Sequence, residues 1–538
     1  MPNNIWEINL DYESINAETT CFSSGSLIHP YPAKAMPNMV SDLLKIIKSN
    51  YHVHNVLDPF CGSGTVGLES KLLGLDFFGS DLNPLAVLIA RTKTLTIDNK
   101  DYVYDQIASL IEDINSKSTL ICPILDFLNI DYWFVQSNII QISNIKFLIN
   151  KFLKDRKKDR QTYALILLTA FSSTIREVCL SRNGEFKLYR IPEAEIVNWK
   201  IDAYDVFKKK IDNLFNLLNE TSSYSSRSKV DIYQANAKEL GYLSNNSINV
   251  VLTSPPYGDS KTTVAYGQFS RLPLQCIGDV LEKYLKINTE HVNCDELLLG
   301  GKKSIINSRN ALIKKITDES VTLRQLFESI DCLILRETIG LEQVAQHLKG
   351  IYDERKYEGA DNTVILNRLK SYIKKKIEKR RVRSKEFYFI EANKYLNFNN
   401  LSKSQIYRRT QHLNNLTNGL IESHKNKISG LPNRKEEIIN FFIDLYQVFN
   451  ETDRVLKQEG LQGWIIGNRT VLGSINVPLS DILSDWFEFR GYSKVTSLTR
   501  KYSFKRLPHH MNSALDREQK ITSMMEEHII VYQKQSID

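Results

Sequence analysis

The segment TSPPY, Thr253 to Tyr257, ends an apolar run that is typical of a buried strand. Proline has a fixed φ and no N–H, so Pro255 and Pro256 make the turn rigid and direct the carbonyls of Ser254 and Pro255 away from the strand end. Ser254 adds a hydroxyl acceptor, and Tyr257 adds an aromatic face on which a flat ring could stack. Alone, Pro-Pro-Tyr is also typical of a polyproline turn or a recognition peptide.

A second group of residues has the spacing of a nucleoside site. Gly62 and Gly64 stand between a predicted strand and a predicted helix, where glycine lets the backbone approach a ligand and the helix start offers unpaired N–H groups. Asp81 lies 17 residues beyond Gly64, where a doubly wound fold uses a carboxylate to accept from both ribose hydroxyls. The loop begins with Asp58-Pro59-Phe60 and lacks the third glycine of the dinucleotide fingerprint, which favours a nucleoside without a pyrophosphate. A lone Gly-x-Gly is also typical of a plain tight turn.

A parallel sheet is needed to bring these residues together. Residues 54–60 predict a short strand, residues 64–74 a helix that ends at Gly74, and residues 75–84 a second strand. Strand, helix and strand within about 30 residues predict a parallel βαβ unit. Further strands are expected at 230–240, at 248–252 (buried on both faces), at 463–468 and at 528–534, with a helix over 436–460 ended by Gly460.

Three sequence stretches resemble the S-adenosylmethionine-dependent DNA amino-methyltransferases, of the cytosine-N4 type found in restriction-modification systems. DPFCGSGT followed by SDLNP resembles motifs one and two of this family, SPPY its catalytic motif four, and IHPYPAKAMPNMVSDLLKII its motif ten. The resemblance covers roughly residues 25–87 and 230–267, and more loosely 436–534. It implies an α/β, Rossmann-like class I methyltransferase fold with a mainly parallel sheet, and S-adenosyl-L-methionine as cofactor. The cofactor-binding residues that it implies are Tyr31, Lys34, Asp58, Phe60, Gly62, Gly64, Thr65, Asp81, Leu82 and Asn236.

Some of these positions have a second interpretation. The segment from His29 to Lys34 could line the methionine end of the cofactor, or it could simply be a rigid start to the helix that follows. Asn236 stands where family members commonly have aspartate, although an amide oxygen could still accept a hydrogen bond from the cofactor adenine.

The resemblance implies that Ser254, Pro255, Pro256 and Tyr257 are catalytic. The lone pair of an exocyclic amine is delocalised into its ring, so fixed acceptors must hold the amine hydrogens out of the ring plane. In this family Ser before Pro-Pro usually accompanies the cytosine amine, and Asp or Asn accompanies adenine, so Ser254 predicts cytosine. A cytosine carbon-5 enzyme would use a cysteine preceded by proline, and no cysteine in the sequence has that context.

The composition favours a soluble protein that contacts nucleic acid. Of 538 residues, 42% are hydrophobic and 25% charged, no apolar run is long enough to cross a bilayer, and no secretory signal is evident, so we expect a cytosolic location in a bacterium or archaeon, in contact with nucleoid DNA. The net charge of +8 is concentrated in residues 368–385, which hold ten Lys or Arg and one acid. A solvated helix face is the alternative explanation of this basic run. The predicted DNA-binding residues are Lys374, Lys375, Lys379, Arg380, Arg381, Arg383, Arg408 and Arg409.

No metal site is expected, because seven scattered cysteines form no Cys-x-x-Cys pair and the adjacent His509 and His510 point apart. The predicted organisation is a methyltransferase domain over 1–100, 230–268 and 435–538, a helical insertion over 101–229, and a target-recognition region over 269–434.

The predicted function is methylation of the amino group of a flipped cytosine in double-stranded DNA, with a possible cognate restriction endonuclease. The alternatives are an adenine amino-methyltransferase, an RNA enzyme, a fused endonuclease-methyltransferase and a DNA-binding protein without catalysis. The sequence DERK at 353–356 contains the Glu-x-Lys that a nuclease could use, but no Pro-Asp partner precedes it.

Overall fold

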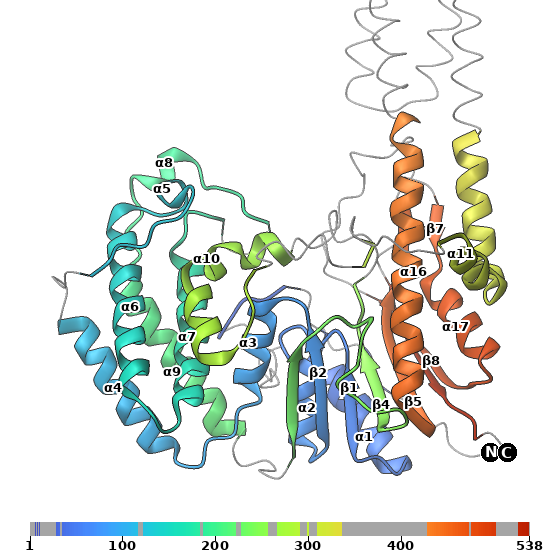
Figure 1. Ribbon diagram of the computed structural model, residues 1–538, viewed down its shortest axis with the longest axis horizontal. Helices are drawn as coiled ribbons and strands as arrows, with labels where there is room; N and C mark the ends of the chain where they lie inside the picture. The colour runs from blue at the N-terminus through green and yellow to red at the C-terminus, as the bar shows by residue number, and fades with distance from the viewer. Residues whose placement is uncertain are drawn as a thin grey trace, which may run out of the picture.

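A seven-stranded sheet forms the centre of the protein (Figure 1). The computed structural model describes residues 6, 8, 10, 28–32, 35–116, 122–182, 187–221, 228–256, 266–290, 299–300, 309–335, 428–472, 475–501 and 526–536. The strand order is β3-β2-β1-β4-β5-β9-β8; β9 is antiparallel to both of its neighbours, and the first five strands in that order are parallel. The strands are β1 (Asn55–Asp58), β2 (Asp76–Asp81), β3 (Val230–Gln234), β4 (Ile248–Thr253), β5 (Leu456–Gly467), β8 (Ser493–Lys501) and β9 (Glu526–Gln533).

The predicted βαβ unit is confirmed. Strand β1, helix α2 (Thr65–Leu72) and strand β2 follow one another, and β1 pairs with β2 in parallel. On its other side β1 pairs with β4, so the chain order reverses between these two strands. In such a sheet ligands bind where the strand order reverses, outside the carboxyl ends of the strands. This topology brings the glycine loop after β1 beside the TSPPY turn after β4.

Successive side chains of the inner strands point to opposite faces of the sheet, so the apolar core forms two layers. Val56 and Val250 belong to the core on one face of the sheet, whereas Leu57 and Val251 belong to the core on the other. From Val250 to Leu252 strand β4 is buried on both faces, as its apolar residues predict. The first layer includes α1 (Pro37–Asn50) and α3 (Pro84–Lys93), and the second includes α16 (Leu431–Val455) and α17 (Leu479–Phe489).

The predicted helical segment between β2 and β3 is found as helices that lie beside α3, at the left of Figure 1. Its core is continuous with the first layer of the sheet core, because α7 packs against both α3 and α10. None of the helices among the described residues is long and apolar enough to cross a membrane. Besides α3, those between β2 and β3 are α4 (Lys100–Ser116), α5 (Ile130–Trp133), α6 (Gln136–Asp155), α7 (Arg160–Val178), α8 (Glu193–Ile196) and α9 (Ala203–Thr221). Helix α10 (Tyr266–Leu285) follows β4 in the chain and packs against this unit.

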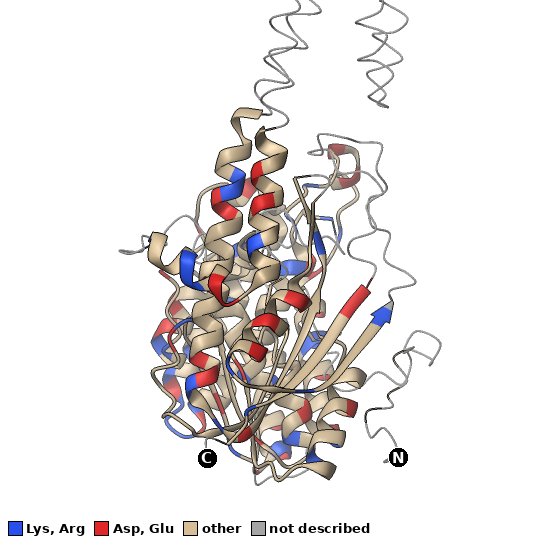
Figure 2. Cartoon of the chain, turned by 90° about the vertical axis from the view of Figure 1, so that its right-hand side faces the viewer, with Lys and Arg blue, Asp and Glu red and all other residues tan. Residues whose placement is uncertain are grey.

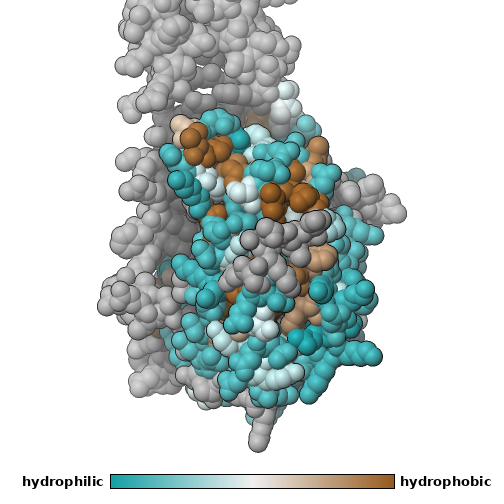
Figure 3. Space-filling model, turned by 90° about the vertical axis from the view of Figure 1, so that its left-hand side faces the viewer, coloured by the Kyte–Doolittle hydropathy of each residue, from teal (hydrophilic) through white to brown (hydrophobic). Residues whose placement is uncertain are grey.

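Figure 3 shows apolar patches on the outer face of this helical unit, among a mainly polar surface. Leu128 and Val197 are 83% and 82% exposed, and Ile124 and Tyr132 are about half exposed. Single exposed apolar residues are normal on soluble proteins, so these patches carry no functional assignment here.

The expected end of the long helix at Gly460 is wrong. Helix α16 ends at Val455, and the chain passes directly into β5, which includes Gly460. Leu456 pairs with Ile248 of β4, while Gly460 O accepts from Lys534 N next to β9. Leu456 is thus held by β4, and Glu459 and Gly460 by Lys534, so tertiary hydrogen bonds override the helix-ending preference of glycine.

On the other side of the sheet, α16 and α11 (Arg309–Asp318) project away from the strands together with a helix over residues 321–335 (Figure 1). Lys435 of α16 pairs with Asp331 at 2.5 Å, and Arg309 pairs with Glu436 at 2.5 Å. Figure 2 shows that positive and negative residues are interspersed along the described turns of this projection. The predicted basic run and Arg408 and Arg409 lie outside the described residues.

The remaining described elements are the two-stranded hairpin of β6 (Arg469–Val471) and β7 (Ile475–Val477).

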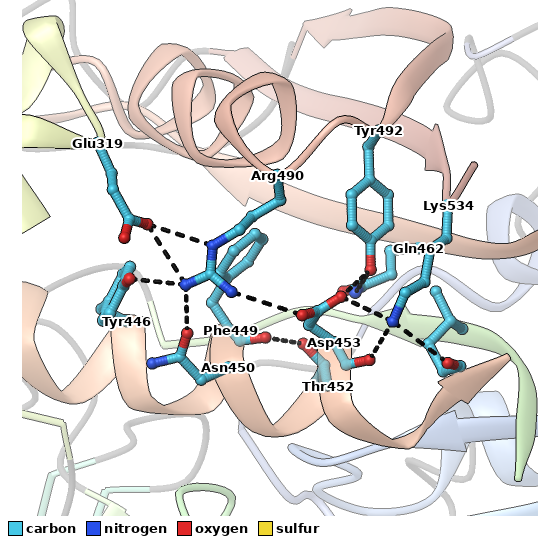
Figure 4. A network of polar contacts seen from close by, with 11 residues as sticks. Glu319, Tyr446, Phe449, Asn450, Thr452, Asp453, Gln462, Arg490, Tyr492 and Lys534 are labelled. Carbon is cyan, nitrogen blue, oxygen red and sulfur yellow. Dashed lines mark hydrogen bonds and ion pairs between the residues drawn. The ribbon is translucent and has the colours of Figure 1, made fainter. Parts of the chain in front are cut away.

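A polar network joins this projection to the sheet (Figure 4). Arg490 Nη2 donates to Tyr446 Oη at 2.7 Å and to Asn450 Oδ1 at 2.8 Å, and it pairs with Glu319 at 3.4 Å. Arg490 Nη1 pairs with Asp453 at 3.5 Å. Lys534, next to β9, also pairs with the Asp453 carboxylate, at 2.9 Å, so one connected network spans α16, α17 and the sheet.

Arg490→Met is expected to lower the free energy of unfolding by about 2 to 3 kcal/mol, because it leaves the Glu319 carboxylate buried without this cation. The Glu319 side chain is 5% exposed and the Arg490 side chain 24% exposed. Urea denaturation measures the change. Lys45→Ala is the control, since its pair with Asp42 is exposed on both sides and its loss should cost less than about 0.5 kcal/mol. Equal effects of the two substitutions would contradict the assignment.

Candidate active site

An open cavity lies at the carboxyl ends of β1, β2, β3 and β4. It brings together eight residues predicted from the sequence, from both the cofactor set and the catalytic turn. These are Tyr31, Phe60, Gly62, Asp81, Leu82, Asn236, Ser254 and Pro256. The glycine loop, the acid that ends β2 and the start of the SPPY turn therefore face one space.

The Asp81 carboxylate is held by the backbone on both sides. Its Oδ2 accepts from Gly62 N at 3.0 Å, and its Oδ1 accepts from Asn83 N at 2.8 Å. Burial raises the pKa of Asp81 to about 6, while these backbone bonds lower it. A carboxylate has about four lone-pair positions, so Asp81 keeps acceptor capacity for ligand hydroxyls. This arrangement fits the ribose of a nucleoside cofactor.

The glycine loop has the backbone conformation that its sequence predicts. Gly62 and Gly64 have φ values of +49° and +81°, in the left-handed region that favours glycine. A Cβ added at Gly64 would lie 2.9 Å from the Cα of Ala90 in α3. Gly64 is therefore needed for close packing of the loop on α3, and Gly62 for the approach of the loop to the cavity.

Gly64→Ala is expected to destabilise the fold by about 2 to 3 kcal/mol and to weaken cofactor binding at least tenfold, because both the φ value and the contact with Ala90 resist a side chain. Thermal unfolding and calorimetric titration with S-adenosylmethionine measure the two effects. Gly241→Ala is the matched control, since a Cβ there meets nothing within 4 Å. Normal cofactor affinity in Gly64→Ala would contradict the role of this loop.

Asp58 and Thr65 were predicted to bind the cofactor, and both are buried behind the cavity wall, with exposures of 3% and 4%. Asp58 Oδ1 accepts from Phe60 N at 3.0 Å and from Thr253 Oγ1 at 2.7 Å. Burial raises the pKa of Asp58 to about 7, against the effect of these two hydrogen bonds, and the nearby Asp81 raises it further. Asp58 thus connects the cofactor loop to the end of β4.

The remaining predicted residues differ in where they lie and in whether the structure describes them. The Asn236 side chain lines the cavity, but its Oδ1 also accepts from Lys238 N at 3.1 Å, closing a local turn. The Tyr31 ring packs edge-on against Phe269, with centroids 5.8 Å apart. Lys34 and Tyr257 lie outside the described residues, so their roles stay predictions.

The cavity also has walls that were not predicted as site residues: Pro59, Asn83, Ala235, Ala237, Tyr266 and Leu299. Tyr266 begins helix α10, in which Phe269 is 2% exposed. The spacing of Phe269, Leu272 and Cys276, all buried, was the available sequence signal for this helix. The boundary predicted at residue 269 falls inside it.

In the sequence, the proline that follows Asn83 indicates that Asn83 caps the start of a helix. Its Oδ1 accepts from Leu85 N and starts α3, while its Nδ2 donates to Ser270 Oγ of α10 at 2.8 Å. Asn83 therefore links the turn after β2 to the helix that carries Tyr266.

Cys61 is the cysteine of the glycine loop, and its environment does not activate it. Its side chain is 5% exposed, and burial beside two carboxyl groups raises the pKa of its thiol. A protonated, buried thiol is a poor nucleophile. Among the described residues no group of three or more His, Cys, Asp or Glu side chains could hold a metal ion; His509 and His510 lie outside them.

Comparison with known proteins gives matches of three kinds. Residues 37–293 match the model of a family described as D12 class N6 adenine-specific DNA methyltransferase. The chain is 27% identical over 497 residues to Type II methyltransferase M.MvaI of Kocuria varians, which covers 89% of this chain and 84% of that relative. It is 34% identical over 94 residues, 17% of each chain, to Type II methyltransferase M.MjaII of Methanocaldococcus jannaschii.

Among solved structures, an rRNA methyltransferase, aviRa from Streptomyces viridochromogenes, aligns with 54% of this chain and 82% of its own at 14% identity. The TM-score of 0.18 is too low for this match to bear on the fold. The fold assignment rests on the strand order and on the cavity at the carboxyl ends of the strands. In sequence, the chain is similar to methyltransferases of DNA.

Proposed function

We propose that the protein methylates the exocyclic amino group of cytosine in double-stranded DNA, after the base has been flipped out of the duplex. The observation that carries the proposal is that Ser254 and Asp81 line the same cavity. Ser254 can accept a hydrogen bond from an amine, and Asp81 can accept hydrogen bonds from the ribose of the cofactor. A base that enters this cavity would therefore meet acceptors next to the cofactor.

In this proposal S-adenosylmethionine supplies an electrophilic methyl group when bound, held by the glycine loop and Asp81. Ser254 Oγ and the Pro255 carbonyl accept the two amine hydrogens and hold them out of the ring plane. The amine lone pair would then attack the methyl carbon directly, without a covalent enzyme intermediate. The bond from the methyl group to sulfur would break as S-adenosylhomocysteine leaves, and the methylated nitrogen would lose one hydrogen as a proton to solvent. Tyr257 is proposed to stack on the flipped base. The prolines keep the acceptors in place without further reorganisation.

The choice of cytosine rests on Ser254, the first residue of the SPPY turn. A specific observation favours adenine as the second candidate, since the matched family description names the N6 amine of adenine. Both candidates share the amine chemistry and differ in the ring that the cavity must accept.

We further propose that the enzyme belongs to a restriction-modification system of type II; two of its relatives are named Type II methyltransferases. The proposed DNA contacts are the basic run at 368–385 together with Arg408 and Arg409, within a target-recognition region over 269–434. A cognate endonuclease is the proposed partner. The division into methyltransferase segments and insertions is part of the same proposal.

The test is product analysis. The purified protein is incubated with S-adenosylmethionine and DNA from a host that lacks DNA methylation, and the DNA is digested to nucleosides for mass spectrometry. The expected product is N4-methylcytosine. If N6-methyladenine is found instead, the substrate is adenine, the second candidate. If 5-methylcytosine is found, the amine mechanism is wrong. Magnesium-dependent cleavage of plasmid DNA by the same preparation would support the fused-nuclease alternative.

A further inference from the structure

The two loops that line the cavity start where β1 and β4 end, and one buried hydrogen bond joins them at that point. Thr253 is the last residue of β4 and is fully buried. Its Oγ1 donates to Asp58 Oδ1, on the last residue of β1, at 2.7 Å. The same carboxyl oxygen accepts from Phe60 N, and Phe60 lines the cavity. One oxygen atom therefore contacts both the cofactor loop and the residue before Ser254.

A threonine at this position needs an explanation, because the three residues before it, Val250 to Leu252, are apolar and fully buried. Valine has nearly the shape of threonine and would avoid burying a hydroxyl, which costs about 1 to 3 kcal/mol when it is unpaired. The hydroxyl is paired here with a carboxyl group that is itself 3% exposed.

We propose that Thr253 is a positioning residue of the methyl transfer, acting through Asp58; this inference rests on the proposed function. Ser254 follows Thr253 directly, so the Thr253 side chain sets where the Ser254 hydroxyl and carbonyl lie relative to the cofactor loop. Transfer requires the reacting atoms to be about 3 to 3.5 Å apart, and an error of about 1 Å can reduce a rate about 100-fold. The hydrogen bond between Thr253 and Asp58 holds the ends of β4 and β1 together, and the prolines hold the conformation of the turn. Together they fix the distance between the Ser254 acceptor and the cofactor loop.

The experiment compares Thr253→Val, which removes the hydroxyl, with Thr253→Ser, which keeps it. Single-turnover methylation is measured with tritiated S-adenosylmethionine on unmethylated genomic DNA, with both reactants saturating. Thr253→Val is expected to lower this rate about 10-fold to 100-fold, while the dissociation constant for S-adenosylmethionine changes less than about threefold. Thr253→Ser is expected to stay within about threefold of the wild-type rate.

Two further variants test whether the effect passes through this bond. Thr452→Val is the matched control, because Thr452 is fully buried and its hydroxyl donates to Phe449 O within α16; its rate should equal that of wild type. In a double-mutant cycle, Thr253→Val should add little to the loss already caused by Asp58→Ala, which removes the acceptor.

The outcomes separate this inference from the proposed function. A wild-type rate in Thr253→Val overturns the inference, and so do equal losses in the valine and serine variants, which would indicate methyl packing. A loss that runs parallel to loss of thermal stability and of cofactor affinity indicates a merely structural role and also overturns it. Wild-type protein that methylates no DNA base overturns the proposed function, and the inference with it.

Discussion

Ser254→Ala is expected to lower the rate of DNA methylation about 100-fold or more while leaving S-adenosylmethionine binding almost unchanged. Ser254 lines the cavity at the end of β4, whereas the residues that fit the ribose come from β1 and β2. Removal of one preorganised hydrogen-bonding group from a reacting centre typically costs about 100-fold to 1,000-fold. The measurements are single-turnover methylation and calorimetric titration with the cofactor.

The matched control for this substitution is Ser173→Ala. Ser173 is 1% exposed in α7, and its hydroxyl has no hydrogen-bond partner within the part of the chain that the structure describes. Its replacement should leave the methylation rate unchanged. If Ser254→Ala methylates DNA at the wild-type rate, Ser254 does not accept from the substrate amine, and the argument for cytosine is lost with it.

The affinity for S-adenosylmethionine is expected to rise about tenfold between pH 5 and pH 7. Burial raises the pKa of Asp81 to about 6, so the carboxyl group is mainly protonated at pH 5 and mainly ionised at pH 7. Ribose hydroxyls donate best to the ionised form, so bound cofactor lowers the pKa of Asp81 and binding releases a proton. Affinity therefore follows the ionised fraction, increasing through about pH 6 and levelling off above it.

Calorimetry in two buffers with different ionisation enthalpies measures this proton release directly. Asp81→Asn is expected to bind the cofactor at least tenfold more weakly at pH 7. Asp58 also titrates in this range, with a pKa raised to about 7, so the same pH series in Asp58→Asn separates the two carboxyl groups. Asp76→Asn, at the other end of β2, is the control and should keep the wild-type pH dependence. An affinity that is constant from pH 5 to pH 7 would exclude Asp81 as the titrating group.

The cofactor side of the site could be predicted from sequence because its signals are local. Gly62 and Gly64 are required by left-handed backbone, and Asp81 follows at the spacing of one βαβ unit. The SPPY turn could be found for the same reason, since two prolines at the end of a buried strand are a local signal.

Other features depended on contacts with distant parts of the chain and were not predicted. Gly460 has the local character of a helix end, but its hydrogen bond from Lys534, next to β9, helps to hold it inside a strand. Tyr266 follows the catalytic turn in sequence, and it lines the cavity because α10 packs against α7 and α3 of the helical unit. Leu299 reaches the same cavity from a further segment.

The sequence by itself determined the candidate residues for binding a nucleoside cofactor and for accepting from an amine, because residue type and short spacing set local conformation and chemistry. Only the tertiary structure decided that these residues share one cavity and that Thr253 donates to Asp58 across 195 positions of the chain. The physical reason is that strand order and register depend on the packing of the whole core, and a buried hydroxyl finds its partner only after the strands have paired.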